Sequence, residues 1–137
     1  MAGETDLKKL LAAMAPKLID GEFVFCSLVS ACYGDYKELE PLAVINEAEG
    51  LTLLVPKHGA DDKGLPYESV YRGITLTIHS SLDAVGLTAS VSTKLAEYGI
   101  SANVISGYYH DHIFVQTELA ERALAAIREL TSYFDNP

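Results

Sequence analysis

A strand, a helix, a hairpin and a second helix follow one another in residues 73–131, and this order constrains the fold most. Gly73–His79 (GITLTIH) alternates strictly between apolar and polar side chains, which predicts a strand with one buried face. Apolar residues then recur at helical spacing as far as Gly99, a residue typical of helix C-termini. ISANVIS and HIFVQ predict a hairpin with its turn at GYYHD, and Thr117 is expected to cap a final amphipathic helix.

This order of elements is most of a ferredoxin-like βαββαβ unit. No closing strand follows Phe134, and an exchange of strands between two halves of the chain would supply one. The preceding residues predict a helix at 5–15, a strand at 22–30 and a hairpin at 42–56. Residues 57–67 are polar and predict a loop or a single short helix. We therefore expect an α/β fold (an α+β sandwich) of two ferredoxin-like halves, residues 1–68 and 69–137. Their sheets should be mainly antiparallel, with helices on one face.

Composition excludes several classes of function. With 49% hydrophobic residues the chain can bury a core, but no run approaches the roughly 18 apolar residues of a membrane span. The formal net charge is -9, without the basic stripe that nucleic-acid binding needs. The first 18 residues are too charged and too periodic for a secretory signal, so a cytosolic protein is expected. The spacing of Cys26 and Cys32 fits no zinc or redox motif, which predicts free thiols. The sequence has no P-loop and no G-x-G-x-x-G motif, and we expect no cofactor.

Topology predicts where the polar side chains gather. In a ferredoxin-like unit the strands at 73–79 and 102–106 run parallel, with the strand at 112–116 antiparallel between them. His79 then lies at the end of its strand and His112 at the start of the neighbouring strand. Both positions belong to the same edge of the sheet, so we expect the histidines to share one rim.

The segment Ser80-Ser81-Leu82-Asp83 is predicted to open the helix at this rim as a capping box, with Ser80 as the cap and Asp83 reaching back. The free amides at a helix start favour a carboxylate or a phosphate. Capping by itself explains these side chains. A ligand-binding role would be additional.

Three motifs carry a resemblance to a known family. They are the strand end Ile78-His79, the loop Asp83-Ala-Val-Gly86, and Gly99-Ile-Ser101, where the family often has Gly-Ile-Asn. Together they resemble an ACT domain over residues 73–131. ACT domains are small βαββαβ modules that bind amino acids, regulate metabolic enzymes and usually pair as dimers. The whole chain also resembles small bacterial proteins of unknown function with two ACT-like halves.

The resemblance implies a non-enzymatic regulatory protein that binds an amino acid or a similar small metabolite. It also implies a homodimer that acts on a separate effector protein. The strand-end histidine is similar to one in the serine-binding ACT domain of phosphoglycerate dehydrogenase. The predicted ligand-binding set joins the residues implied by the family to those added by topology: His79, Ser80, Ser81, Asp83, Gly86, Leu87, Ser101, Asn103, Tyr108, His110 and His112.

Two chemical alternatives depend on the histidines. His110 and His112 lie on one side of a strand, so with His79 nearby they could hold a metal ion, although no supporting carboxylate or cysteine is visible. A hydrolase would need a set such as Ser80, His79 and Asp111. The adjacent serine and histidine would point apart, and the sequence contains no nucleophile elbow. We predict neither a metal site nor an enzyme.

A third alternative is a protein–protein interaction module. If one sheet face packs under the helices, Thr75, Thr77, His112 and Phe114 lie on the other face. That face must be open or covered, and it would serve as a dimer seam. The hairpin turn could also be polar only because it is solvated.

Overall fold

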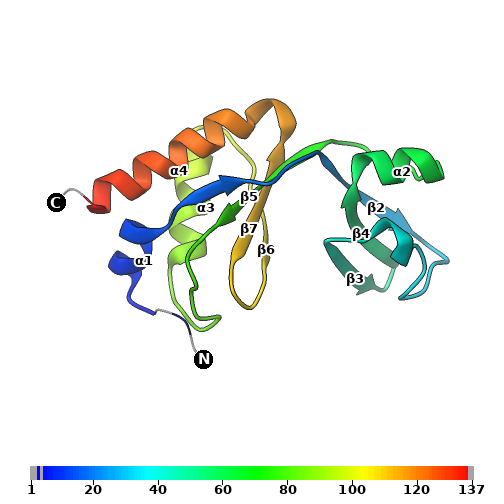
Figure 1. Ribbon diagram of the computed structural model, residues 1–137, viewed down its shortest axis with the longest axis horizontal. Coiled ribbons are helices and arrows are strands. Elements are labelled where there is room, and N and C mark those ends of the chain that lie inside the picture. The colour runs from blue at the N-terminus through cyan, green and yellow to red at the C-terminus, as the bar shows by residue number, and fades with distance from the viewer. Residues whose placement is uncertain (1–2, 4, 136–137) are drawn as a thin grey trace. The chain divides into compact units, whose positions relative to one another are not determined.

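The computed structural model describes residues 3 and 5–135, which divide into two compact units (Figure 1). The terminal unit combines the described parts of residues 1–19 and 72–137, and the inserted unit is Asp20–Tyr71. Each unit has its own hydrophobic core. The N-terminal segment thus belongs with the C-terminal half, whereas the boundary expected between residues 68 and 69 would place it in the first half.

The sheet of the terminal unit has the strand order of a ferredoxin-like fold. Its strands are β1 (Pro16–Leu18), β5 (Tyr71–Leu76), β7 (Asp111–Gln116) and β6 (Asn103–Ser106), in that spatial order. β1 pairs antiparallel with β5, and β6 pairs antiparallel with β7. The sequence patterns did not predict β1, because three residues after a helix show no alternation. It is the fourth strand that the segment after residue 73 lacks.

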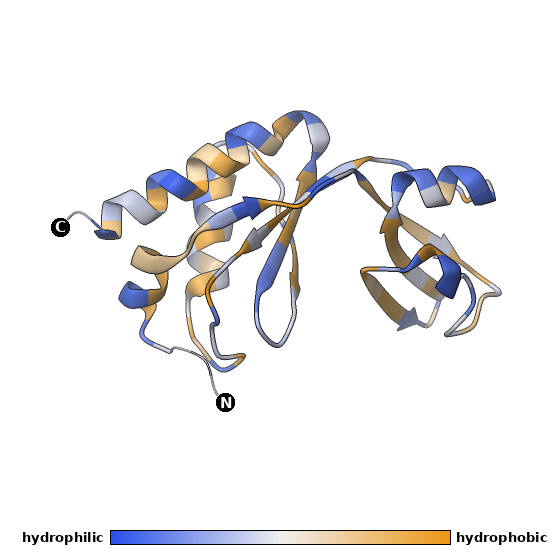
Figure 2. Ribbon diagram, viewed as in Figure 1, coloured by the Kyte–Doolittle hydropathy of each residue, from blue (hydrophilic) through white to orange (hydrophobic). Residues whose placement is uncertain are grey.

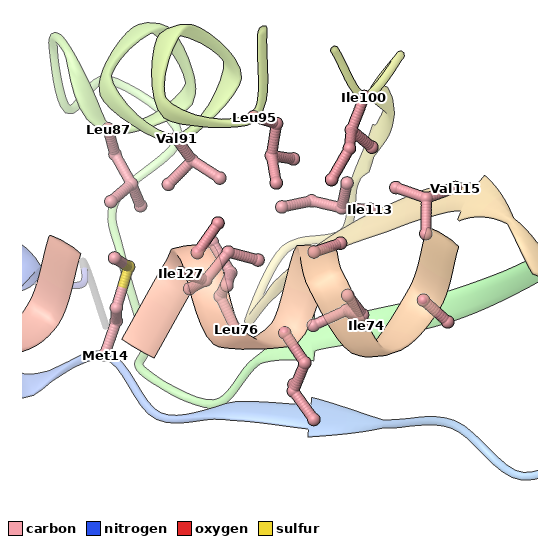
Figure 3. Close-up of a cluster of buried hydrophobic side chains, with 14 of the residues drawn as sticks. Met14, Ile74, Leu76, Leu87, Val91, Leu95, Ile100, Ile113, Val115 and Ile127 are labelled. Carbon is pink, nitrogen blue, oxygen red and sulfur yellow. The ribbon is translucent and has the colours of Figure 1, made fainter. Parts of the chain in front are cut away.

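Three helices cover one face of this sheet: α1 (Leu7–Ala13), α3 (Leu87–Glu97) and α4 (Ala120–Asp135). Figure 3 shows α3 side chains pointing toward Ile113 of β7 and Ile127 of α4. Hydrophilic and hydrophobic residues alternate along α4 (Figure 2), as its amphipathic pattern predicts. α1 begins as expected, because the side chain of Asp6 accepts a hydrogen bond from the Lys9 amide at 3.1 Å.

The last helix begins differently from the prediction. A short 3-10 turn, η2 (Thr117–Leu119), precedes α4, and the position before it is Gln116. Thr117 is therefore not the cap. Its Oγ1 is buried without a hydrogen-bond partner in the described part of the chain. The backbone leaves β7 in a tighter turn than a capped α-helix start would make.

The inserted unit repeats the strand pattern with less helix. β3 (Ala43–Glu47), β4 (Gly50–Pro56) and β2 (Phe23–Leu28) are neighbours in this order, and α2 (Lys57–Lys63) follows β4. Both pairings are antiparallel, and the predicted β3–β4 hairpin is confirmed. Tyr71, the first residue of β5, pairs with Phe23 of β2. Where a ferredoxin-like unit has its first helix, residues 29–42 contain only the 3-10 turn η1 (Lys37–Leu39).

Two ferredoxin-like units with antiparallel strand pairs confirm the predicted fold class. Both cysteines are free thiols, with Cys26 buried and Cys32 exposed, as expected. Burial raises the pKa of the Cys26 thiol, which keeps it protonated at neutral pH. None of the helices in the described residues is long and apolar enough to span a membrane.

Candidate ligand-binding site

The loop after β5 differs from its predicted form. β5 ends at Leu76, and Thr77 leaves the strand with its amide and its hydroxyl both donating to the Ala15 carbonyl. α3 begins only at Leu87, after Gly86. Ser80 therefore does not cap the helix and Asp83 does not reach back, so the predicted capping box is wrong. Ala84 continues the apolar helical spacing of α3 back into the loop, so the spacing could not locate the helix start.

Ser81 instead organises the loop. Its Oγ accepts a hydrogen bond from the Asp83 amide at 3.1 Å, and its carbonyl accepts one from the Ala84 amide at 3.0 Å. These bonds form a local turn of the kind that serine makes outside helices. As a result the loop carries its own ordered polar groups, several residues before the helix amides.

Gly86 and Leu87 have structural positions in this loop. The φ of Gly86 is +101°, and a Cβ there would come within 2.9 Å of Cδ2 of Leu7. Glycine is needed both for the backbone conformation and for the close packing of α1. Leu87 is buried in the core, next to Val91 (Figure 3). Gly86 and Leu87 therefore pack against α1 and the core, and neither lines the hollow described below.

A small hollow lies between this loop and the hairpin. Its volume is about 220 Å³, and its lining consists of Gly3, His79, Ser81, Leu82, Asp83 and Tyr108. Four of these residues belong to the predicted set. Ser80, which follows His79, is buried at 8% exposure. The structure thus brings together a carboxylate, an imidazole, a hydroxyl and a phenol from two segments that are separated by α3 in the sequence.

Gly3 closes one side of the hollow with its backbone. A Cβ at this position would lie 2.6 Å from the carbonyl oxygen of His79 and 2.8 Å from the amide nitrogen of Ser81. Such distances are too short for any side chain, so only glycine fits. The sequence patterns did not indicate Gly3, because its close neighbours, His79 to Ser81, are far away in the sequence.

The hairpin tip packs its tyrosines against His79. The imidazole centroid lies 4.9 Å from the ring of Tyr109 and 5.9 Å from that of Tyr108. The two tyrosine rings are 5.1 Å apart and nearly perpendicular. The turn is closed by the Gly107 amide, which donates to the His110 carbonyl at 2.9 Å. Tyr109, which was outside the predicted set, is therefore a direct neighbour of His79.

His112 has a separate environment on the sheet. Its Nδ1 lies 2.9 Å from Oγ1 of Thr75 on the neighbouring strand, at hydrogen-bonding distance. Burial lowers the pKa of His112, and His110 lowers it further, while Asp111 acts in the opposite direction. The ring is therefore neutral at pH 7. Neither His110 nor His112 lines the hollow.

Ser101 and Asn103 lie away from the hairpin tip. Asn103 of β6 pairs with Phe114, whereas Ser106, at the tip end, pairs with Asp111. At roughly 3.3 Å per residue, Asn103 is about 10 Å from the end of β6 at which the turn begins. The Asn103 side chain donates to the Phe114 carbonyl at 3.2 Å. The structure does not bring these two members of the predicted set to the hollow within one chain.

The arrangement offers little for metal chemistry. Within residues 3 and 5–135, no group of three His, Cys, Asp or Glu side chains is placed to hold a metal ion. The imidazole of His79 packs on tyrosine rings, and His112 contacts Thr75. What the hollow can do is bind a small polar molecule through one acceptor and several donors.

Comparisons with known proteins agree with this fold. Two family models described as ACT domains match residues 2–72 and 68–129. The chain belongs to the ACT domain family. Neither matching model is that of a catalytic domain. ACT domains are regulatory modules, and membership supports a small-molecule-binding regulatory role. The search of curated proteins returned no match.

Solved structures include a relative with half of its residues identical. A Vibrio cholerae protein of unknown function, described as a possible transport protein, is 52% identical, with a TM-score of 0.83. The match covers 91% of this chain and 95% of that one. An Agrobacterium tumefaciens protein is 15% identical with a TM-score of 0.72, and the match covers 86% of this chain and 89% of that one.

The regulatory subunit of aspartate kinase from Thermus thermophilus has the same fold. It is 11% identical, with a TM-score of 0.64, and the match covers 88% of this chain and 97% of that one.

Proposed function

We propose that this ACT protein binds an amino acid in the hollow between the His79–Gly86 loop and the hairpin tip, without catalysing a reaction. One observation carries the proposal: His79, Ser81, Asp83 and Tyr108 line one hollow of about 220 Å³. A free amino acid has an ammonium and a carboxylate group a few ångströms apart. The hollow offers a partner for each.

Charge complementarity assigns the two groups. The Asp83 carboxylate is the acceptor for the ligand ammonium, and the His79 imidazole and Tyr108 hydroxyl are donors for the carboxylate. The volume is below the roughly 300–1,000 Å³ typical of pockets for drug-sized molecules, which favours a small ligand. Tyr109 would hold the imidazole in place by ring contact.

The output of binding is a shift between two conformations. A regulator responds only if its ligand binds one state better than the other. The exposed hairpin tip and the loop are the elements that a ligand would draw together. We further propose that the chain acts as a homodimer in the cytosol on a separate effector protein. Ser101 and Asn103 would then reach a ligand only from a second subunit, while His110 and His112 would position the hairpin.

The test is a thermal denaturation screen with the twenty amino acids. A ligand that binds the folded state raises the midpoint in proportion to RT ln(1 + [L]/Kd). We expect one or a few amino acids to raise it, and Asp83→Asn to abolish the shift. Asp62→Asn, an exposed aspartate in α2, is the matched control and should respond like the unaltered protein. No shift with any amino acid would refute an amino-acid ligand.

A second candidate function is a protein–protein contact at the same loop. Leu82 is 63% exposed and Tyr109 61% exposed, beside the hollow. Exposed apolar side chains close together are typical of contact surfaces. We expect Leu82→Ser to shift the protein toward monomer in sedimentation experiments if this surface forms a dimer. An unchanged particle size would exclude this surface from the dimer contact.

The dimer seam expected on the sheet needs correction. Phe114 is completely buried, and a Cβ on Gly73 would lie 2.7 Å from its ring. Thr77 is hydrogen-bonded to Ala15, and Thr75 contacts His112. Because the Phe114 ring is completely buried against Gly73, it is not available for a contact with a second subunit.

A further inference from the structure

A second hollow lies entirely within the inserted unit and is rich in aromatic side chains. Its volume is about 320 Å³, and its walls include Phe25, Ser27, Tyr67, Glu68, Ser69 and Tyr71. Phe25 and Ser27 belong to β2, and Tyr71 is the first residue of β5. The other wall residues lie in the connection between α2 and β5. None of them belongs to the loop or the hairpin of the proposed amino-acid site.

Strand alternation explains why this hollow is open. Val24 and Cys26 of β2 point into the core of the inserted unit, so Phe25 and Ser27 point to the opposite face of the sheet. Phe25 is half-buried, although it is one of the largest apolar side chains of the chain. The connection between α2 and β5 adds Tyr67 and Glu68 to its surroundings.

The aromatic rings form a corner. The centroids of Phe25 and Tyr71 are 5.3 Å apart, and the ring planes are perpendicular at 89°. Tyr67 is held by its hydroxyl, which donates to Oδ1 of Asp61 at 2.7 Å. This hydrogen bond raises the pKa of Tyr67, so the phenol stays uncharged. Each ring face carries the negative end of its quadrupole, which makes the corner attractive to cations.

The charged side chains around the hollow also favour a cation. Glu68 contributes a carboxylate to the lining and, among the described residues, takes part in no ion pair. The ammonium of Lys57 is already held by Asp61 at 2.9 Å. The whole chain has a formal net charge of -9, so its field adds to the attraction for a cation.

We propose that this hollow binds a small organic cation of the alkylammonium class. The rings of Phe25, Tyr67 and Tyr71 contact the alkylated nitrogen, and the Glu68 carboxylate balances its charge. Alkylammonium suits such a site because its charge is spread over methyl groups that pack against ring faces, and it costs little desolvation. The site is independent of the amino-acid hollow, since it uses different residues in the other unit.

The experiment is a titration of the full chain with tetramethylammonium, followed by backbone amide NMR. Shifts are expected at residues 25–27 and 67–71, whereas tert-butanol, a neutral molecule of similar shape, should produce none at equal concentration. Glu68→Gln and Tyr71→Leu should each weaken the titration by about fivefold or more, the effect of losing one cation–π or ionic contact. Glu49→Gln and Tyr133→Leu, at exposed positions outside the hollow, are the matched controls.

Three results would overturn the proposal. They are equal shifts with tert-butanol, equal weakening by Glu49→Gln and Glu68→Gln, or no shift at 25–27 and 67–71. Glu68 is exposed, so Glu68→Gln keeps the test decisive even if Tyr71→Leu disturbs the fold. The amide shifts report each residue separately, so a negative result at this hollow says nothing about the amino-acid site. A negative result at the amino-acid site likewise says nothing about this hollow.

Discussion

The terminal and inserted units share a strand pattern but cover it differently. In the terminal unit the connection from β5 to β6 contains the 11-residue helix α3, which joins α1 and α4 over the sheet. In the inserted unit the equivalent connection, residues 29–42, has only the turn η1, and single side chains such as Tyr36 and Leu39 cover the core. The ACT strand order therefore tolerates the loss of a helix if loop residues replace its apolar face.

Removing a core side chain of the terminal unit should have the largest effect. Ile127 of α4 is completely buried between α3 and the sheet. We expect Ile127→Ala to lower the free energy of unfolding by about 2–5 kcal/mol, because a packed three-helix layer cannot close the cavity. Urea unfolding followed by circular dichroism measures this loss. Thr93→Ala, at an exposed position of α3, should change it little, and a loss below that of Leu39→Ala would contradict the comparison.

Glycine substitutions compare the two units at their helix ends. Gly86→Ala should cost about 1–3 kcal/mol, because a φ of +101° strains alanine and the new Cβ meets Leu7. Gly64 in the inserted unit has a φ of +67° with nothing near the added Cβ, so Gly64→Ala should cost only about 1 kcal/mol. The difference between the two losses of unfolding free energy, measured in urea, combines the contact with Leu7 and the less favourable φ at Gly86. Equal losses would show that neither adds a measurable cost.

A loop side chain of the inserted unit should matter less than a core residue. Leu39 of η1 is half-buried and lies against α2, where a Cβ on Gly59 would be 3.2 Å from its Cδ2. Leu39→Ala is expected to cost about 1–2 kcal/mol in urea unfolding, since only part of its surface is removed from water. A negligible loss would mean that the loop does not replace the missing helix. Glu40→Ala, exposed at the next position, is the control.

The smallest effect is expected from pH. The folded-state pKa of His112 lies below its ordinary value of 6.5, mainly through burial. As pH falls through about 6.5, the unfolded chain therefore binds the proton first and stability decreases, until the folded pKa is passed. The thermal midpoint should be lower at about pH 5.5 than at about pH 7.5, and His112→Asn should reduce the difference. His58→Asn, an exposed histidine of the inserted unit, should leave it unchanged.

Part of the candidate site could be predicted from topology alone. The end of β5 and the start of β7 lie at the same edge of the sheet, because these strands are antiparallel neighbours. The strand order was therefore enough to predict that the hairpin tip lies beside His79. The register of β6 places Asn103 at the far end of the strand from the turn, and Ser101 precedes the strand. Gly3 and Tyr109 became visible only in three dimensions, since close backbone approach and ring contact leave no periodic signal in the chain.

Periodicity and composition are local properties, so the succession of strands and helices in residues 73–131, the amphipathic helices and the acidic character could be predicted from the sequence. Long-range packing is not local, and only the folded chain shows that residues 16–18 complete the sheet of the C-terminal half, that α3 begins at Leu87, and which polar side chains enclose the hollow. A strand of three residues forms only where the edge of another strand, here β5, is available to pair with it. The loop before α3 forms a turn at Ser81 in place of an earlier helix start, and this choice depends on how the loop packs.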